Sequence, residues 1–218
     1  MSRIPVKICG LKDEAMIDAA LEAGAEMIGL VFFAKSPRSV SLVEAARLAD
    51  HMRGKTQIVA LCVDMPLADM EQMVAQVQPD ILQLHGTEST ETCAQVRERF
   101  SRPVMKALGV SCAADIEAAF AYGDVIDRFL FDAKPPKNSD IPGGNGIRFD
   151  WTLLRDTKLP KPYMLSGGLD ASNVAEALRV SGAPAVDVSS GVESSRGVKD
   201  PAKISAFLRA VRGAHMQD

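Results

Sequence analysis

The chain has 218 residues, of which 47% are hydrophobic and 24% are charged. This composition is typical of a folded globular protein and excludes a disordered chain. Its 25 Lys and Arg residues against 28 Asp and Glu residues give a formal net charge of −3 at pH 7, and aromatic residues make up 5%. Neither the charge nor the aromatic content favours a nucleic-acid partner.

The longest apolar stretch runs from Met27 to Ala34, far short of the roughly 20 residues that a membrane-spanning helix needs. Lys7 interrupts the segment where a signal peptide would keep its apolar run. We therefore expect a cytoplasmic protein with no membrane partner. The four cysteines are widely separated and form no C-x-x-C pair: Cys9, Cys62, Cys93 and Cys112. Free thiols are expected, rather than a metal site or a disulfide framework.

Short apolar runs alternate with segments of helical periodicity, which predicts β-α units around a parallel sheet. Eight strands are expected, at Val6–Cys9, Met27–Val31, Ile58–Val63, Ile81–Leu84, Val104–Leu108, Phe129–Phe131, Tyr163–Leu165 and Ala185–Val188. Several are continuously apolar, as strands buried on both faces tend to be. Eight units in this length predict one α/β domain over residues 1–218, a single (β/α)8 TIM barrel with little insertion.

The helices between these strands carry recognisable ends. Ser41 and Glu44 have the spacing of a capping box, and Asp200 before Pro201 is a typical helix start. Two apolar stripes at helical spacing are expected to belong to the core: Leu67, Met70, Val74 and Val77, and then Ile204, Phe207, Leu208 and Val211.

The sixth unit is the weakest, because a long loop follows its strand and its helix, near Trp151–Leu154, looks short. The loop begins at Lys134-Pro135-Pro136 and ends at Gly143-Gly144-Asn145-Gly146. A loop of this length favours a functional role over a simple connection. Its glycine-rich end is interpreted either as a mobile lid or as a plain flexible loop.

In such a barrel the active site forms at the C-terminal ends of the strands and in the loops that follow. The candidates there are Cys9, Arg38, His85, Asp132, and the segments Ser166-Gly167-Gly168 and Ser189-Ser190-Gly191. The last two follow strands seven and eight, where barrels of this class often hold a phosphate on backbone N–H groups. The ligand expected is a phosphate ester, although glycines that serve only turn geometry are the alternative.

Cys9 and Asp132 can face each other across a small sugar phosphate, as a base and an acid on opposite sides. A thiolate at neutral pH requires a lowered pKa, for which the N-terminus of the helix beginning near Lys12 is one source. The alternatives are a buried, inert thiol for Cys9 and a structural ion pair with Lys134 or Arg128 for Asp132.

The other polar residues near the strand ends have supporting roles. Arg38 can bind a second anionic group, or it is a surface arginine without a partner. Lys7 and Asp187 lie on neighbouring strands and are expected to form a buried structural ion pair. Gln83 and His85 share one face of strand four, and either could contact the substrate, with a structural histidine as the alternative.

Seven segments, in order along nearly the whole chain, resemble the phosphoribosylanthranilate isomerase family of tryptophan biosynthesis. They are Lys7-Ile8-Cys9-Gly10-Leu11, Ser36-Pro37-Arg38, Gln83-Leu84-His85-Gly86, Phe131-Asp132, Gly143-Gly144-Asn145-Gly146 with Phe149-Asp150-Trp151, Ser166-Gly167-Gly168-Leu169, and Asp187-Val188-Ser189-Ser190-Gly191-Val192-Glu193. Each segment alone is weak evidence, but their joint occurrence at the expected barrel positions makes chance agreement improbable.

The resemblance implies an Amadori rearrangement of N-(5-phosphoribosyl)anthranilate to its aminodeoxyribulose isomer, without a metal or organic cofactor. It implies that Cys9 is the general base, that Asp132 is the general acid, and that Arg38 holds the anthranilate carboxylate. The phosphate would lie on Gly167, Gly168, Ser189, Ser190 and Gly191, with Gln83, His85 and Gly144 as further substrate contacts. The protein would be a monomer or a homodimer.

Departures from the family pattern are modest. Ala60 and Cys62 stand where the family often has Gly and Phe, so a second thiol is expected near the barrel mouth, and Ala171 replaces a frequent proline. Three alternatives remain: a histidine-pathway sugar isomerase, which would have Asp at the position of Cys9, indoleglycerol-phosphate synthase, and a non-catalytic phosphosugar-binding barrel.

Overall fold

Eight parallel strands pair in chain order and close into a barrel in the computed structural model, which describes residues 3–134 and 141–214. The strands are β1 (Val6–Cys9), β2 (Met27–Phe32), β3 (Gln57–Cys62), β4 (Ile81–Leu84), β5 (Val104–Val110), β6 (Arg128–Ala133), β7 (Tyr163–Leu165) and β8 (Val186–Val188). All eight predicted strands are confirmed. The sequence predicts them well because continuous apolar runs are typical of strands covered on both faces.

The barrel closes where β8 pairs with β1, with Lys7 opposite Asp187 and Ile8 opposite Val188. Side chains alternate between the barrel interior and the outer layer that faces the helices. The interior is filled by one compact cluster: Met27, Val59, Ile81, Met105, Ala107, Leu130, Met164 and Ala185. The barrel is therefore a packed core, and its mouth is left to the strand ends.

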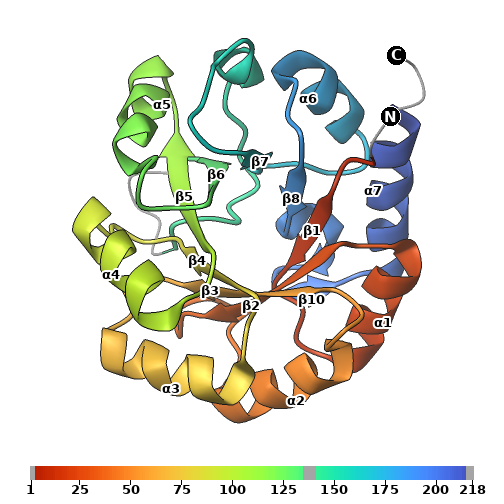
Figure 1. Cartoon of the computed structure of the whole chain (residues 1–218). Coiled ribbons are helices and arrows are strands. Elements are labelled where there is room, and N and C mark those ends of the chain that lie inside the picture. The colour runs from red at the N-terminus through yellow and green to blue at the C-terminus, as the bar shows by residue number, and fades with distance from the viewer. Residues whose placement is uncertain (1–2, 135–140, 215–218) are drawn as a thin grey trace.

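Helices surround the strands (Figure 1). They are α1 (Glu14–Ala23), α2 (Leu42–Met52), α3 (Leu67–Val77), α4 (Thr90–Phe100), α5 (Ala113–Ala119), α6 (Val174–Ser181) and α7 (Pro201–Ala214). A 3-10 turn, η1 (Phe120–Tyr122), follows α5, and another, η2 (Trp151–Leu154), takes the place of a helix in the sixth unit. This short turn confirms the weak sixth unit; the start of its loop, with Pro135 and Pro136, lies outside the described residues.

The helix ends follow the sequence signals. Ser41 and Glu44 form a capping box at α2, and the carboxylate of Asp200 accepts hydrogen bonds from the first turn of α7. The predicted stripe of α7 is buried throughout. In α3 the residues Met70 and Val77 are buried, but Met73, absent from the predicted stripe, is buried as well.

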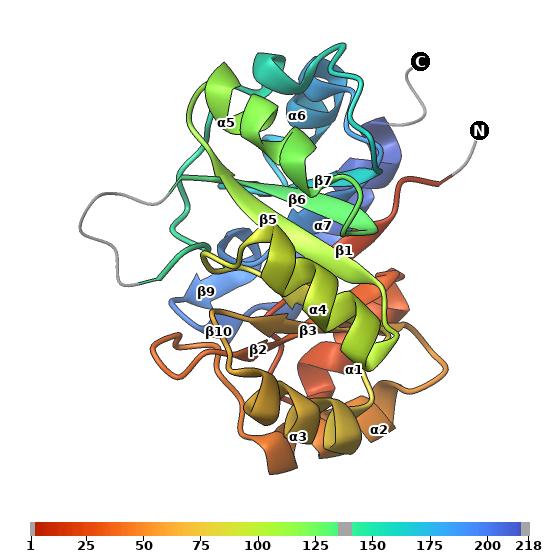
Figure 2. The ribbon, with the colours of Figure 1, turned by 60° about the vertical axis from the view of Figure 1, so that its left-hand side comes forward.

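A short antiparallel hairpin that the sequence analysis does not predict stands between β8 and α7. A 3-10 turn, η3 (Ser190–Val192), leads into its strands β9 (Glu193–Ser195) and β10 (Val198–Lys199). Figure 2 shows the hairpin on the same side of the molecule as the loop after β2. It therefore lies on the face formed by the C-terminal ends of the strands.

All four cysteines are free, as predicted. The expectation that Cys62 lies near the barrel mouth is wrong: the side chain is fully buried in the outer core between barrel and helices. Burial raises the pKa of Cys62 to about 12. The inward position next to it belongs to Leu61, which lines the mouth. In the described parts of the chain, every helix is too short or too polar to cross a membrane.

Candidate active site

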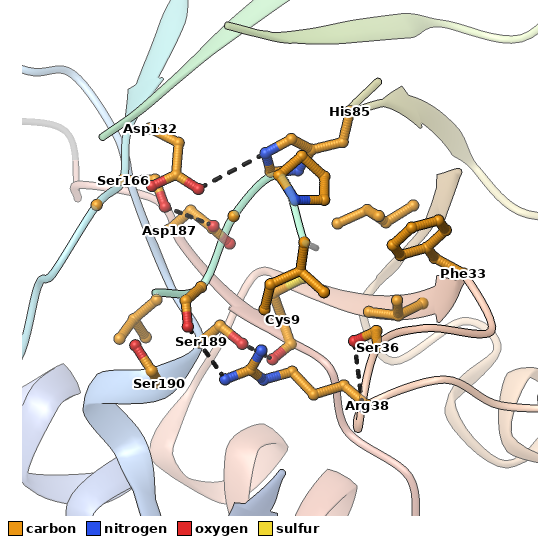
Figure 3. Close-up of a pocket in the computed structure, with 18 of the residues that line it drawn as sticks. Cys9, Phe33, Ser36, Arg38, His85, Asp132, Ser166, Asp187, Ser189 and Ser190 are labelled. Carbon is orange, nitrogen blue, oxygen red and sulfur yellow. Dashed lines mark hydrogen bonds and ion pairs between the residues drawn. The ribbon is translucent and has the colours of Figure 1, made fainter. Parts of the chain in front are cut away.

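A pocket opens at the C-terminal ends of the strands, where the sequence places the candidate residues. Its walls include Cys9 from β1, Arg38 from the loop after β2, His85 after β4 and Asp132 from β6. Figure 3 shows Asp132 and His85 pointing toward each other on one side, with Arg38 on the opposite side. The end of β8 and the loops after β7 and β8 add Ser166, Gly167, Gly168, Leu169, Val188, Ser189 and Ser190.

Cys9 ends β1 and is 3% exposed. Its sulfur lies beside Gly29 of β2, where an added Cβ would come within 2.9 Å of Sγ. Burial raises the pKa of the Cys9 thiol, and the positive charges of Lys7 and Lys199 oppose that effect. Helix α1, the other source considered for a lower pKa, begins at Glu14 with Asp13 as its N-cap, close to the predicted start.

A buried polar row lies beneath the thiol, as predicted for Lys7 and Asp187. Lys7 Nζ lies 2.8 Å from Asp187 Oδ1, with both side chains at most 7% exposed. The other carboxylate oxygen of Asp187 accepts a hydrogen bond of 3.0 Å from Ser166 Oγ. Although burial lowers the pKa of Lys7, the negative charges of Asp187 and Cys9 outweigh burial and raise it, so this ammonium stays charged next to the thiol.

Asp132 is buried near the end of β6 and is not paired with either cation considered for it. Lys134 forms its ion pair with Asp115, 3.1 Å away, and Arg128 begins β6 at the other end of the strand. One oxygen of Asp132 accepts a hydrogen bond from Ala133 N, and the other lies 3.6 Å from His85 Nε2. The second oxygen therefore faces the pocket.

Gln83 is fully buried beneath His85. Its amide nitrogen lies 3.1 Å from His85 Nδ1, which holds the imidazole ring toward Asp132. Gln83 Oε1 is a buried oxygen without a hydrogen-bond partner among the described residues. Of the two residues predicted to contact the substrate, His85 lines the pocket, whereas Gln83 lies behind His85 and supports its ring.

The glycine-rich end of the long loop covers the side of the pocket where Asp132 lies. Gly143 packs so closely on Asp132 that a Cβ there would overlap Oδ2 of the carboxylate and would lie 2.8 Å from the ring of His85. The predicted contact Gly144 also lines the pocket, and its carbonyl oxygen accepts a hydrogen bond of 3.4 Å from Arg38 Nη2. The glycine-rich end of the loop thus forms part of the site.

Arg38 is 4% exposed and has a partner, which excludes the interpretation as a free surface arginine. Its Nε and Nη2 atoms lie 2.7 Å and 3.0 Å from the two carboxylate oxygens of Glu193. The guanidinium is therefore held along one edge, and Nη1 is left on the side of Gly144, close to where a Cβ of that glycine would lie.

The loop after β7 adds backbone of unusual conformation to the pocket wall. Gly167 and Gly168 have φ values of +90° and +62°, and a Cβ on either would lie 2.6 Å from a backbone atom of Ala133 or Ile147. Glycine is therefore required here both by conformation and by space. Ser189 Oγ donates a hydrogen bond of 3.0 Å to the carbonyl of Cys9, which ties the loop after β8 to β1.

Comparisons with known proteins agree with this arrangement. The sequence profile of the family described as N-(5'phosphoribosyl)anthranilate (PRA) isomerase matches residues 6–210. The chain belongs to this family. The N-(5'-phosphoribosyl)anthranilate isomerase of Mesorhizobium japonicum is 52% identical over 211 residues, which are 97% of this chain and 96% of that protein. A protein of the same name from Rhodopseudomonas palustris is 54% identical over 209 residues, 96% of each chain.

Solved structures of phosphoribosyl anthranilate isomerases share the fold. The structure from Thermotoga maritima has a TM-score of 0.87 and 34% sequence identity, covering 96% of this chain and 99% of that one. Another phosphoribosyl anthranilate isomerase structure, with a TM-score of 0.83, the same identity and the same coverage, is in complex with reduced 1-(O-carboxyphenylamino)-1-deoxyribulose 5-phosphate.

Most predicted site residues of this phosphoribosylanthranilate isomerase family member meet in the one pocket. Gly191 lies outside its lining and packs closely against the backbone of Leu169, which a Cβ there would overlap. Sequence reasoning missed two buried charged residues on the hairpin, Glu193 and Lys199. Glu193 follows the Ser-Ser-Gly segment by two residues, but nothing in the local pattern connects it to Arg38. Among the described residues, no cluster of three or more His, Cys, Asp or Glu side chains could hold a metal.

Proposed function

We propose that this chain isomerises N-(5'-phosphoribosyl)anthranilate, the reaction for which its family is named, with Asp132 as general acid and Cys9 as general base. The observation that carries the assignment is the shared pocket: both residues line it, one from β1 and one from β6. Glycine-rich loops from β7 and β8, the strands between them in the closed barrel, provide the place for the phosphate.

The chemistry uses both groups in turn. Asp132, as the general acid, gives a proton to the ribose ring oxygen, the bond from that oxygen to C1 breaks, and the anthranilate nitrogen forms an iminium with C1. The iminium makes the C2 hydrogen acidic, and the Cys9 thiolate removes it as a proton. The resulting enol with an amino group on C1 becomes the C2 ketone by taking a proton at C1 and giving up the proton of its C2 hydroxyl. These two transfers balance the proton that Cys9 took and the proton that Asp132 gave. No redox partner is required, because C1 is reduced as C2 is oxidised within the same molecule.

The two anionic ends of the substrate fit different parts of the pocket wall. Arg38 offers a guanidinium held from behind by Glu193, which suits the carboxylate of anthranilate. The loops with Gly167, Gly168, Ser189 and Ser190 suit the phosphate, because glycine lets backbone N–H groups approach an anion closely. A ligand bound at both ends would lie with its sugar between Cys9 and Asp132.

The proposal extends to the setting in which the enzyme works. We infer a cytoplasmic enzyme that acts as a monomer or a homodimer and uses no metal or organic cofactor. The family relationship supports this setting.

Turnover of phosphoribosylanthranilate by the purified protein tests the function. We expect Cys9→Ala and Asp132→Asn to lower kcat by at least about a hundredfold, the usual contribution of a general acid or base. Both variants should still bind the reduced aminodeoxyribulose phosphate analogue within a few-fold of wild type. Cys112→Ala is the matched control, because that thiol is exposed and outside the pocket.

A folded wild-type protein that binds the analogue without turning over the substrate would overturn the proposal. It would leave the non-catalytic phosphosugar-binding barrel as the explanation. Full activity in the Cys9→Ala variant would retain the function but remove the assigned base.

A further inference from the structure

We propose that Glu193 is a positioning residue for substrate binding: with Lys199 it sets Arg38 for the carboxylate and ties that arginine to the loop that receives the phosphate. This inference rests on the proposed function, in which Arg38 binds the anthranilate carboxylate. Glu193 does not line the pocket of Cys9 and Asp132, so it acts through other residues.

The contact between Glu193 and Arg38 is bidentate and buried. Nε and Nη2 of the guanidinium lie 2.7 Å and 3.0 Å from Oε1 and Oε2, and both side chains are 5% exposed. Two parallel hydrogen bonds fix the plane of a guanidinium as well as its position. The edge that remains is therefore presented to the pocket in one orientation before any ligand arrives.

Lys199 joins this pair to the loop after β8. Its Nζ lies 2.9 Å from Glu193 Oε1 and donates to two atoms of Ser189, the carbonyl oxygen at 2.8 Å and Oγ at 3.1 Å. Ser189 lines the pocket on the side proposed for the phosphate. One buried carboxylate thus connects the binding groups for both ends of the substrate.

The hairpin holds Glu193 in place from several directions. Gly197 N donates a hydrogen bond of 3.0 Å to Glu193 Oε2, and Lys203 Nζ from α7 donates one of 2.6 Å to its carbonyl oxygen. The turn packs against the loop that carries Arg38, because a Cβ on Gly197 would lie 3.0 Å from the carbonyl oxygen of Pro37. Figure 2 shows β9 and β10 beside that loop.

The buried cluster of Arg38, Lys199 and Glu193 has a net positive charge that can attract an anion. Arg38 and Lys199 contribute two positive charges and Glu193 one negative charge. Although burial raises the pKa of Glu193, the hydrogen bonds from Arg38 and the charge of Lys199 lower it to about 2. The carboxylate therefore stays ionised at neutral pH, and the cluster keeps one uncompensated positive charge beside the pocket.

Charge neutralisation is the competing explanation for Glu193. If the carboxylate only cancelled positive charge, its removal would leave a more positive arginine and would tighten the binding of a carboxylate. If it positions Arg38, its removal frees the guanidinium to rotate and weakens that binding. The two explanations thus predict opposite signs for the same measurement.

The experiment compares two inhibitors that differ only in the carboxylate. One is reduced 1-(o-carboxyphenylamino)-1-deoxyribulose 5-phosphate, and the other is the same compound without its carboxyl group. In Glu193→Gln we expect the inhibition constant of the first to rise about tenfold, since charged hydrogen bonds of this kind are lost. The inhibition constant of the second should stay within about twofold, and KM should rise more than kcat falls.

Three further variants separate the roles. Glu193→Asp keeps the charge but is too short to reach both guanidinium nitrogens, so positioning predicts the same selective loss and neutralisation predicts none. Lys199→Met should weaken both inhibitors by a similar factor, because it loosens Ser189 on the phosphate side. Ser194→Ala, an exposed position on the same hairpin, is the control and should change neither constant.

The outcomes distinguish the inference from the function on which it rests. If wild type binds both inhibitors equally, Arg38 does not bind the carboxylate. That result would overturn both the role assigned to Arg38 and the inference about Glu193. If wild type prefers the carboxylate and Arg38→Met loses that preference while both Glu193 variants keep it, only the positioning role is overturned. Tighter binding of the carboxylate by Glu193→Gln would overturn it too.

Discussion

At the scale of single residues, burial controls the reactivity of Cys9. The thiol is almost fully enclosed, and desolvation of the thiolate raises its pKa above the ordinary value. Lys7, held by Asp187 at 2.8 Å, supplies the largest opposing effect. The ion pair predicted as structural support therefore has a second consequence, because it sets how much thiolate is present near neutral pH.

We expect Lys7→Met to shift the rising limb of the kcat/KM profile to higher pH. The thiolate accumulates as pH rises through the pKa of Cys9, and loss of the ammonium raises that pKa further. The profile of kcat/KM between about pH 6 and about pH 10 reports this group in the free enzyme. The rate near neutral pH should fall, and the rate at high pH should recover in part.

The double variant Lys7→Met/Asp187→Asn is the control for the unpaired carboxylate. The negative charge of Asp187 also raises the pKa of Cys9, so its removal should move the limb part of the way back. A limb that stays in place in Lys7→Met would show that this lysine does not support the thiolate.

At the scale of elements, the sixth unit has a short 3-10 turn in place of a helix, and its contacts with the pocket come from the segment around Gly143. The φ of Gly143 is not positive, so glycine is required at this position only because a Cβ would not fit against Asp132 and His85. A methyl group here must displace either the carboxylate or the segment itself.

Gly143→Ala should therefore lower kcat/KM by at least about tenfold, because a displacement near 1 Å in an active site can cost a hundredfold in rate. Gly213→Ala in α7 is the matched control, since a Cβ there has no atom within 4 Å. Steady-state kinetics and thermal unfolding of both variants provide the measurement. Wild-type kinetics in Gly143→Ala would mean that the segment moves away from Asp132 before catalysis.

The elements differ in how far their sequence predicts them. Strands β1 to β8 are covered on both faces and leave continuous apolar runs, so their positions could be read within two residues. The hairpin of β9 and β10 has strands of three and two residues with mostly polar side chains, and such strands leave no periodic pattern. The hairpin is held by the ion pair of Glu193 with Arg38 and by the hydrogen bond from Lys203 to the carbonyl oxygen of Glu193. Both contacts form only in the folded protein.

The site shows the same division. Cys9, Arg38 and Asp132 could be placed at the pocket because a barrel brings the last residues of its strands and the loops that follow them to one face. The orientation of Cys62 could not, since a strand apolar on both faces does not reveal which side chains point inward. Glu193 was missed as a partner of Arg38 because 155 residues separate them in the chain.

At the scale of the whole molecule, helix α7 contributes to the buried core but not to the pocket wall. Helix α7 packs between α1 and α6, across the place where β8 closes the barrel against β1. Its buried stripe includes Phe207, which is fully enclosed. None of the described residues of α7 lines the pocket. Damage to this helix should therefore cost stability without altering the chemistry.

We expect Phe207→Ala to lower the free energy of unfolding by about 3–5 kcal/mol, the usual cost of removing a buried phenyl group and leaving a cavity. Urea unfolding measures this change, and the kcat of the remaining folded enzyme at low temperature should equal that of wild type. The matched control is Phe120→Ala, because Phe120 is 47% exposed and its truncation should cost only about 0.5 kcal/mol. Equal losses in the two variants would contradict the packing of α7, and a fall in kcat confined to Phe207→Ala would mean that closure of the barrel and the geometry of the site are coupled.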